Sequence, residues 1–249
     1  MRARTRPGRL HAFDGWLALE ERALLSAPGL LVDLGFGASA ITTFELSQAF
    51  PAHQVLGLEL DAARVEAARR EFPQLDVRVG SLDSSSPTAA LVVRIANVAR
   101  GMTKPRAAEL HTHAARWLVE GGVCLEGSTD VEGHVSSFWV LRKRGGEVVR
   151  EALVFQTDFA RGFSPWLFRD VLPRALRRDV RPGTAIGTLL EQWADAWQLV
   201  RGAEPEPSFR ASLERLSLVR ADVSPRLASG GYCVWLTPPS EPGAFTSES

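Results

Sequence analysis

Short apolar runs alternate with longer amphipathic stretches along the first half of the chain. The apolar runs have the length of buried strands and end in glycine, proline or polar residues, whereas the stretches between them carry apolar residues at helical spacing. Strands that alternate with helices predict a parallel sheet covered by helices on both faces. The predicted strands lie at 30–34, 54–61, 75–83, 88–98 and 123–128, and the predicted helices at 13–27, 38–50, 62–72 and 104–119.

The pattern changes in the second half of the chain. Two strands around a Gly-Gly turn are followed by helical periodicity and by a last apolar strand, over 136–156, 164–219 and 231–238. We therefore expect an α/β fold built on one main domain. Its predicted parts are an N-terminal helix or lid at 1–28, the domain itself at 29–240 with a helical elaboration at 164–218, and a disordered tail at 241–249.

Two local signals bear on where helices begin and end. Asp14 is a residue type that can cap the first predicted helix at its N-terminus. The Glu-Gly-Gly sequence at 120–122 is expected to end the fourth predicted helix, because glycine is favoured just after a helix.

Charge and cysteine usage narrow the function classes. Positive and negative side chains balance at 29 each, so no extensive nucleic-acid surface is expected, although a local basic patch is compatible with this balance. Cys124 and Cys233 lie in apolar runs and are expected to be buried thiols without metal-ligand spacing. The sequence has no apolar run long enough to span a bilayer and no secretory signal, which predicts a cytoplasmic protein without membrane segments.

A glycine-rich segment follows the first predicted strand and opens the next helix. Gly35 and Gly37 permit a tight turn and a close approach of a ligand to the backbone. Glu59 ends the second strand, where its carboxylate can accept hydrogen bonds from both hydroxyls of a ribose. The segment from Gly35 to Ala40 also fits the dinucleotide fingerprint G-x-G-x-x-G/A. Asp33, however, would repel a pyrophosphate and attract the ammonium group of a methionine moiety.

These segments resemble the class I S-adenosylmethionine-dependent methyltransferases, whose first motif is acid-x-Gly-x-Gly. VDLGFGAS fits that motif, VLGLELD fits the second motif with Glu59 as its acid, and WLVEGGVCLEGS resembles the helix, Gly-Gly and fifth strand of the family. The resemblance covers roughly residues 29–128. It implies a Rossmann-like methyltransferase fold with a mostly parallel seven-stranded sheet, and S-adenosyl-L-methionine as cofactor. The residues that it assigns to the cofactor are Asp33, Gly35, Phe36, Gly37, Glu59, Leu60, Ser81, Leu82 and Asn97.

The sequence also departs from the family pattern. Ser81 stands where the family often has an acid after glycine, so that its hydroxyl or Asp83 would have to contact the adenine. Ser39 replaces the third glycine of the first motif. The fourth strand ends in Ile-Ala-Asn-Val at 95–98, without the Asn-Pro-Pro-aromatic or Pro-Cys sequences of the family. This argues against methylation of nucleic-acid amino groups or of cytosine C5.

Polar residues after the fourth and fifth strands are candidates for the acceptor side, because ligands of open α/β sheets gather at the carboxyl ends of the strands. Methyl transfer mainly requires alignment, and a base is needed only where the acceptor still carries a proton. The catalytic candidates are Asn97, Asp130 and His134, and the substrate-binding candidates are Arg100, Glu126 and Thr129. Asn97 is also compatible with a capping role and Arg100 with a solvated loop charge, and for Asp130 and His134 an ordinary polar loop is the favoured alternative. No metal site is predicted, since His111 and His113 are two apart on a helix and point in different directions.

We therefore expect an S-adenosylmethionine-dependent methyltransferase that acts on an unassigned, small-molecule acceptor. The alternatives are a catalytically inactive S-adenosylmethionine-binding or regulatory protein, and an NAD(P)-dependent oxidoreductase. Trp193 and Trp197, at helical spacing, are expected to pack against the sheet rather than to line an acceptor pocket. The oligomeric state is not predicted.

Overall fold

The computed structural model describes residues 5–83, 89–216 and 231–235, and for the last of these ranges the description is confined to the backbone. The strands form one sheet in the order β3-β2-β1-β4-β5-β6-β7-β8. They are β1 (Leu30–Leu34), β2 (Gln54–Glu59), β3 (Asp76–Val79), β4 (Ala90–Ala96), β5 (Leu118–Thr129), β6 (Val135–Arg144), β7 (Glu147–Thr157) and β8 (Gly231–Trp235).

Helices connect the strands and form a separate group near the end of the described chain. The α-helices are α1 (His11–Glu20), α2 (Ile41–Ala49), α3 (Ala62–Glu71), α4 (Lys104–Trp117), α5 (Arg174–Arg177), α6 (Ala185–Val200) and α7 (Pro205–Glu214). Three 3₁₀ helices are also present among the described residues: η1 (Leu24–Ser26), η2 (Ala99–Gly101) and η3 (Pro165–Asp170).

The sheet combines a parallel half with an antiparallel half. The neighbouring strands from β3 to β5 are all parallel, whereas β5–β6, β6–β7 and β7–β8 are antiparallel pairs. β1 lies between β2 and β4. The chain therefore adds β2 and β3 on one side of β1 and then returns to add β4 and β5 on the other side, as in Rossmann-like folds. The described sheet has eight strands, one more than the resemblance implies, because β6, β7 and β8 form an antiparallel meander after β5.

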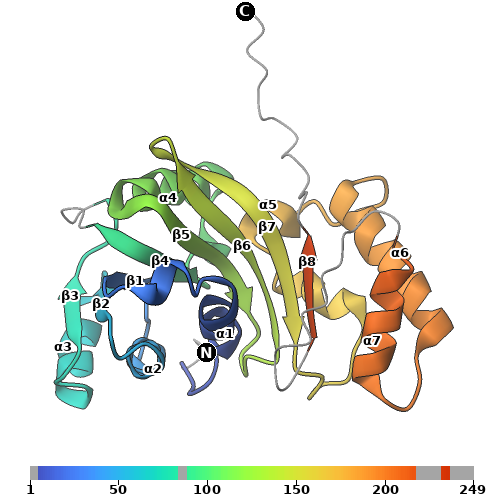
Figure 1. Ribbon diagram of the computed structural model, residues 1–249, viewed down its shortest axis with the longest axis horizontal. Helices are drawn as coiled ribbons and strands as arrows, with labels where there is room; N and C mark the ends of the chain where they lie inside the picture. The colour runs from blue at the N-terminus through green and yellow to red at the C-terminus, as the bar shows by residue number, and fades with distance from the viewer. Residues whose placement is uncertain (1–4, 84–88, 217–230, 236–249) are drawn as a thin grey trace, which may run out of the picture.

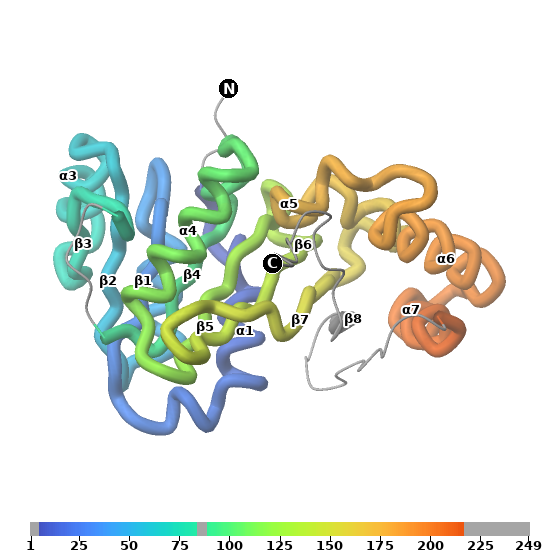
Figure 2. The backbone as a smooth tube through the Cα atoms, turned by 90° about the horizontal axis from the view of Figure 1, so that it is seen from above, coloured from blue at the N-terminus to red at the C-terminus, as the bar shows by residue number. Residues whose placement is uncertain are grey.

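Helices cover both faces of the sheet. Alternate residues of β1 show this directly: Leu31 packs with α1 and α2 on one face, whereas Val32 and Leu34 pack with α4 and the later helices on the other. Figure 1 shows α3 beside the β3 edge and α6 and α7 beyond β8 at the opposite end of the sheet. Figure 2, from above, shows α4 lying across the parallel strands. The α/β class and the mixed, mostly parallel sheet are therefore confirmed.

The first helix belongs to the core of the domain. Phe13 stacks on Phe138 of β6 with ring centroids 4.4 Å apart, and Trp16 meets the same ring edge-on. The prediction that Asp14 caps this helix is wrong, because the N-cap position is Leu10 and Asp14 lies in the first turn. Its carboxylate instead contacts Arg94 beneath the helix.

The Glu-Gly-Gly sequence does not end a helix, contrary to the prediction. α4 ends at Trp117, and residues 120–122 lie inside β5. The pairing between β4 and β5 shifts register here, from Ala90 opposite Leu118 to Val92 opposite Val123. Gly121 has φ +79°, a conformation that glycine adopts without steric cost, so these glycines accommodate an irregularity in the strand.

The aromatic residues of the second half form a packed cluster. Trp193 is fully buried and stacks on Phe168 of η3 at 5.5 Å, while Trp197 meets Phe163 edge-on at 4.7 Å. The prediction that these tryptophans pack rather than line an acceptor pocket is therefore confirmed. Cys124 is buried as expected. The predicted helical end at 217–219, the tail at 241–249 and the side chain of Cys233 lie outside the described residues.

Within the described parts of the chain, no helix combines the length and the apolar character that crossing a membrane would require.

Candidate cofactor and substrate site

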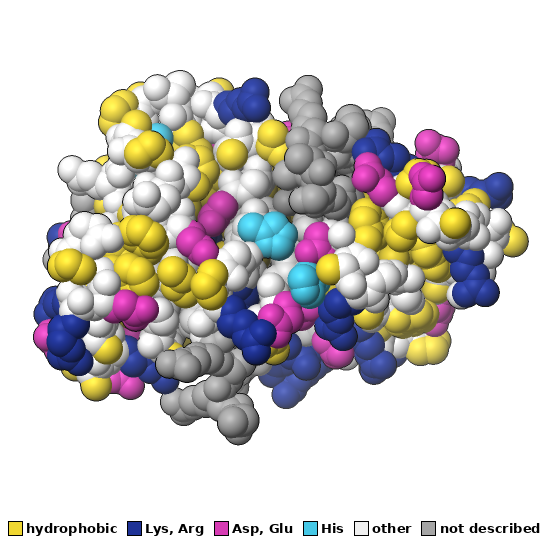
Figure 3. Space-filling model, turned by 90° about the horizontal axis from the view of Figure 1, so that it is seen from below, with side chains coloured by type: hydrophobic (Ala, Val, Ile, Leu, Met, Phe, Trp, Pro, Cys, Tyr) yellow, Lys and Arg dark blue, Asp and Glu magenta, His cyan; other side chains and the backbone are white. Residues whose placement is uncertain are grey.

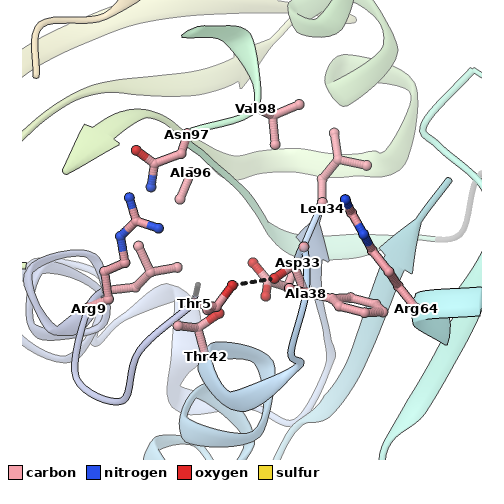
Figure 4. A pocket seen from close by; sticks show the side chains of 14 residues that line it. Thr5, Arg9, Asp33, Leu34, Ala38, Thr42, Arg64, Ala96, Asn97 and Val98 are labelled. Atoms are coloured by element: carbon pink, nitrogen blue, oxygen red, sulfur yellow. Dashed lines mark hydrogen bonds between the residues drawn. The ribbon is translucent and has the colours of Figure 1, made fainter. Parts of the chain in front are cut away.

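A cavity of about 600 Å³ opens at the carboxyl ends of β1 and β4. This is the point where the strand order reverses, and it is where ligands of open α/β sheets bind. Its volume falls within the usual range of ligand pockets, about 300–1,000 Å³. Figure 4 shows its lining, which includes Thr5, Arg9, Asp33, Gly35, Thr42 and Asn97.

The glycine turn after β1 lines this cavity. Gly35 and Gly37 have φ values of +74° and +78°, which side-chain-bearing residues rarely adopt. A Cβ at Gly35 would lie 2.7 Å from Cγ2 of Val98, and one at Gly37 would lie 3.3 Å from the hydroxyl of Thr5. The turn therefore needs glycine both for its backbone and for the space beside it. Phe36 is buried, and its carbonyl accepts a hydrogen bond from Thr5 at 3.2 Å.

Glu59 stands beside the glycine turn, at the end of β2. Its Oε2 accepts a hydrogen bond from the N–H of Gly37 at 2.9 Å. Its Oε1 accepts from the N–H groups of Leu60 and Asp61 at 3.0 and 3.2 Å, and Arg64 lies 3.6 Å from the same oxygen. These bonds fix the carboxylate in place. Because each carboxylate oxygen has two acceptor sites, Oε2 keeps one for a ligand hydroxyl.

Beneath the glycine turn, Asp33 is bound to groups of the protein. Its Oδ1 accepts a hydrogen bond from Nε of Arg94 at 2.9 Å, and its Oδ2 accepts one from the hydroxyl of Thr43 at 2.6 Å. Arg94 is fully buried and also contacts Asp14, while its Nη2 donates to the carbonyl of Thr42 at 2.8 Å. Sequence analysis did not identify Arg94, although a charged residue within an apolar strand was a visible signal.

Asp14, Arg94 and Asp33 together form a buried charge cluster. Burial raises the pKa of Asp14 to about 6, against the opposing effect of Arg94. Although burial disfavours the charge on Arg94, the two neighbouring carboxylates raise its pKa above the ordinary value. With both carboxylates ionised, two negative charges face one guanidinium, so the cluster then carries one net negative charge under the cavity. The sequence suggested that Asp33 alone would attract a cation. In the structure this attraction depends on Asp14, Arg94 and Asp33 together.

The segment before α1, which lies within the predicted N-terminal helix or lid, contributes Thr5, Arg9 and Leu10 to the cavity. Arg9 donates from Nε to the carbonyl of Asp130 at 3.0 Å, and its guanidinium points into the cavity toward Asn97 (Figure 4). Its terminal nitrogens have no bonding partner among the described residues. Burial lowers the pKa of Arg9, and nearby Arg100 lowers it further. The residues preceding α1, rather than its aromatic face, line the cavity.

The other residues that the resemblance assigned to the cofactor differ in accessibility. Leu60 is 70% exposed although it is apolar and follows β2 directly. The side chain of Leu82 is buried, and its carbonyl accepts a hydrogen bond from the indole of Trp117 at 2.9 Å. Ser81 donates a hydrogen bond to Asp83. Hydrogen bonds from Ser81 and Arg106 lower the pKa of Asp83 to about 2.

Asn97 follows β4 at the cavity wall and is hydrogen-bonded to β5. It has φ +63°, a left-handed conformation that asparagine tolerates better than most residues. Its N–H donates to the carbonyl of Gly127 at 2.8 Å, and its Oδ1 accepts from the N–H of Thr129 at 3.2 Å. Arg100 donates to the carbonyls of Thr129 and Asp170 at 3.2 and 3.0 Å. The structure thus brings Asn97, Arg100 and Thr129 together.

Of three further acceptor-side candidates, Thr129 and Asp130 have side chains occupied by bonds within the protein, and Glu126 lies away from the cavity. Thr129 is buried, and its hydroxyl donates to the carbonyl of Val135 at 3.1 Å. Asp130 accepts from the N–H groups of Gly133 and His134 at 2.7 and 2.9 Å. Its other oxygen lies 3.0 Å from Arg161, so this carboxylate closes the β5–β6 turn. Glu126 is buried with His111 of α4 3.6 Å away, beneath the helix rather than at the cavity.

His134 differs from these because an acid orients its ring. Nδ1 of His134 lies 2.7 Å from Oδ2 of Asp158, just after β7, and the side chain of His134 is 33% exposed. A carboxylate at Nδ1 holds the proton there and leaves Nε2 as the acceptor. The turn that carries His134 also touches Arg9, since a Cβ at Gly133 would lie 2.8 Å from Cα of Arg9. Asp158 gave no signal in the sequence, because the two residues meet only through the pairing of β6 with β7.

Titratable side chains gather on the underside of the molecule. Figure 3 shows histidine, acidic and basic side chains near the centre of this face, between areas with many hydrophobic side chains. Within the described residues, no group of three or more histidine, cysteine or acidic side chains is arranged to hold a metal ion.

No protein-family model and no curated protein matches the chain. Among solved structures, DesVI from Streptomyces venezuelae is 18% identical over 60% of this chain and 63% of its own, with a TM-score of 0.40. CalS10, an amino pentose methyltransferase from Micromonospora echinaspora, is 20% identical over 59% of this chain and 67% of its own, with a TM-score of 0.39. The sugar N-methyltransferase KedS8 from a Streptoalloteichus species is 18% identical over 57% of this chain and 63% of its own, with a TM-score of 0.39.

The chain spans about two thirds of the length of these similar structures or less.

Proposed function

We propose that this protein is an S-adenosylmethionine-dependent methyltransferase that acts on a small-molecule acceptor. The observation that carries the proposal is the net negative cluster of Asp14, Arg94 and Asp33 under the glycine turn. A sulfonium and an ammonium group gain from this charge, whereas the pyrophosphate of a dinucleotide is repelled by it. At the glycine turn this charge therefore favours the methionine part of S-adenosylmethionine over a pyrophosphate, two ligands that the glycine pattern alone allows.

Residues in and beside the cavity fit the rest of that cofactor. Glu59 keeps one acceptor site for a ribose hydroxyl beside the glycine turn. The exposed side chain of Leu60 offers an apolar face to an adenine. The terminal nitrogens of Arg9, which point into the cavity, suit the carboxylate of the methionine part. Glu59 and Leu60 lie where β2 leads into α3, beside the glycine turn, and Arg9 comes from the segment before α1.

On the acceptor side, the protein would supply alignment and a base. S-adenosylmethionine supplies an electrophilic methyl group when bound. His134 would accept the proton of an acceptor hydroxyl or amine at Nε2, while Asp158 holds the ring in the required tautomer. Asn97, fixed by its bonds to β5, would orient the acceptor. Asp130 is left out of this assignment because its oxygens already bind the turn.

Calorimetric titration tests the proposal directly. We expect the full chain to bind S-adenosylhomocysteine, and to bind NADH weakly or not at all. Glu59→Gln should weaken the binding of S-adenosylhomocysteine by about tenfold, the loss of one charge-assisted hydrogen bond. Glu191→Gln, on the exposed surface of α6, is the matched control and should change nothing.

The outcomes separate the candidate functions. Binding of NADH alone would support an NAD(P)-dependent oxidoreductase and contradict the proposal. Binding of S-adenosylhomocysteine without transfer of the methyl group to any acceptor in a screen of small amines, hydroxyls and carboxylates would support an inactive binding or regulatory protein. Asp33 is a poor site for this test, because its replacement leaves Arg94 partly unpaired in the core.

A further inference from the structure

A second cavity, of about 490 Å³, lies between η2 and the segment from η3 to α5. Its lining is dominated by arginine side chains from three short elements. Apart from Gly101, the lining residues are Arg100, Arg169, Asp170, Arg174, Arg177 and Arg178. Five guanidinium groups therefore face one carboxylate, in a chain whose positive and negative residues balance at 29 each. We call this the arginine cavity.

Most of this positive charge is not neutralised by the described residues. Arg169, Arg177 and Arg178 have no ion pair or hydrogen bond with any of the described residues. Arg174 uses only Nε, which donates to the carbonyl of Met102 at 2.7 Å. Arg100 bonds only to neutral groups, so within the described part of the chain no carboxylate is bonded to any of the five. Like charges gathered in a concave, partly buried place cost free energy that a bound anion would remove.

The pKa of Arg100 reflects its position beside another positive charge. Burial lowers the pKa of Arg100, and the charge of Arg177 lowers it further, against the opposing effects of Asp170 and Asp130. Arg177 is itself only partly exposed. Freely solvated arginine side chains rotate away from one another because their charges repel. Arg100 is instead held in place by its hydrogen bonds to the carbonyls of Thr129 and Asp170.

Arg100 also joins the arginine cavity to the cofactor cavity. Its Nη1 lies 3.5 Å from Oδ1 of Asn97, and Asn97 lines the cofactor cavity. A molecule with an anionic group among the arginines would therefore extend its other end toward the carboxyl end of β4. This is the side of the sheet from which an acceptor must approach.

We propose that the arginine cavity binds a phosphoryl or diphosphoryl group of the methyl acceptor. A multiply charged anion suits five arginines better than a single carboxylate does, and the planar guanidinium matches phosphate oxygens in pairs. A nucleic acid is the weaker interpretation, because its backbone needs an extended basic surface, whereas these arginines line one local hollow in a chain of zero net charge. The assignment of the anion to an acceptor rests on the proposed methyltransferase function.

The test is calorimetric titration of the full chain with inorganic pyrophosphate at low ionic strength. We expect saturable binding of one pyrophosphate. Arg177→Gln/Arg178→Gln should weaken it by at least about tenfold, through the loss of two charged donors. Arg116→Gln/Arg215→Gln removes the same charge from exposed positions outside the cavity and should have little effect. Equal weakening in both double variants, or no binding at all, would overturn the proposal. The unfolding midpoint of each variant controls for folding.

Two further titrations identify the source of the anion. Phenyl phosphate should bind more tightly than inorganic phosphate if the site takes an acceptor, because the organic part has the adjoining space to occupy. Equal affinity would mean a site for a free inorganic anion and would contradict the acceptor assignment. Tighter binding of single-stranded oligonucleotide than of pyrophosphate, with steep dependence on salt, would indicate a nucleic-acid site and also contradict it.

Titration with S-adenosylhomocysteine in parallel keeps the two proposals apart. If the protein binds pyrophosphate but does not bind S-adenosylhomocysteine, the anion site is supported and the proposed function is contradicted. The reverse result would support the proposed function and overturn the arginine cavity as a ligand site.

Discussion

Asp33 of β1 and Arg94 of β4 lie opposite each other in neighbouring parallel strands and form an ion pair inside the sheet, with Nε of Arg94 2.9 Å from Oδ1 of Asp33. The pair lies close to the glycine turn, and Arg94 forms a second ion pair with Asp14 of α1. One buried guanidinium thus joins the N-terminal helix to two central strands. The same side chain sets the charge beneath the cofactor cavity, so the packing of α1 and the electrostatics of the site are coupled.

Removal of the buried guanidinium should be costly. We expect Arg94→Gln to lower the free energy of unfolding by about 3–5 kcal/mol, because two carboxylates would remain buried without their partner. Denaturation in urea measures this. Arg116→Gln, on the exposed face of α4, should change stability by less than about 0.5 kcal/mol. The double variant Asp33→Asn/Arg94→Gln should cost less than the sum of its single substitutions. Additive costs would mean that the pair is not energetically coupled.

Asp14 should make stability depend on pH in mildly acidic solution. Its pKa is raised to about 6 in the folded protein from an ordinary value of 3.8, so between these values the folded state binds more protons than the unfolded state. The contribution of Asp14 to stability is therefore greatest below about pH 4, falls as pH rises to about 6, and is constant above that. Because one pKa unit corresponds to about 1.4 kcal/mol, the fall amounts to about 3 kcal/mol.

Comparison with Asp14→Asn isolates this effect from other titrating groups. The unfolding free energy of the wild type minus that of the variant should decrease across this range of pH. A difference that is flat, or that increases with pH, would mean that Arg94 outweighs burial and keeps the pKa of Asp14 at or below its ordinary value.

Gly35 is required for both backbone conformation and space. In Gly35→Ala the residue would keep φ near +74° at a cost of about 1–2 kcal/mol, and its Cβ would meet Cγ2 of Val98 at 2.7 Å. We expect the turn to move and the affinity for S-adenosylhomocysteine to fall by at least about tenfold. Gly146→Ala is the matched control, since Gly146 also has positive φ, at +91°, but has open space around it.

The role of space can be separated from that of strain. Val98→Ala removes the methyl group that a new Cβ would meet, so Gly35→Ala/Val98→Ala should recover part of the lost affinity. If it recovers none, the left-handed backbone of Gly35 alone accounts for the effect.

The main architecture follows from the sequence because its signals are local. The alternation of apolar runs with amphipathic helices predicts the parallel half of the sheet, and the glycines after β1 indicate the cavity. The bonding of Asp33 could not be predicted, because Arg94 becomes its partner only through the register of β1 against β4. His134 could be named from its place after β5, but its partner Asp158 depends on the pairing of β6 with β7. The arginine cavity likewise assembles from elements that are far apart in the sequence.

Arg9 offers the sharpest test of how the cofactor cavity recognises its ligand. If its guanidinium binds the carboxylate of the methionine part, Arg9→Gln should lower the affinity for S-adenosylhomocysteine by roughly tenfold to a hundredfold, as expected for a charge-assisted hydrogen bond. The affinity for 5′-methylthioadenosine, which lacks that carboxylate, should not change. Arg9→Lys keeps the charge and should retain part of the affinity. Glu59→Gln should instead weaken both ligands, because both carry the ribose. Equal loss of both ligands in Arg9→Gln would show that Arg9 only supports the turn at Asp130, to whose carbonyl it is bound at 3.0 Å.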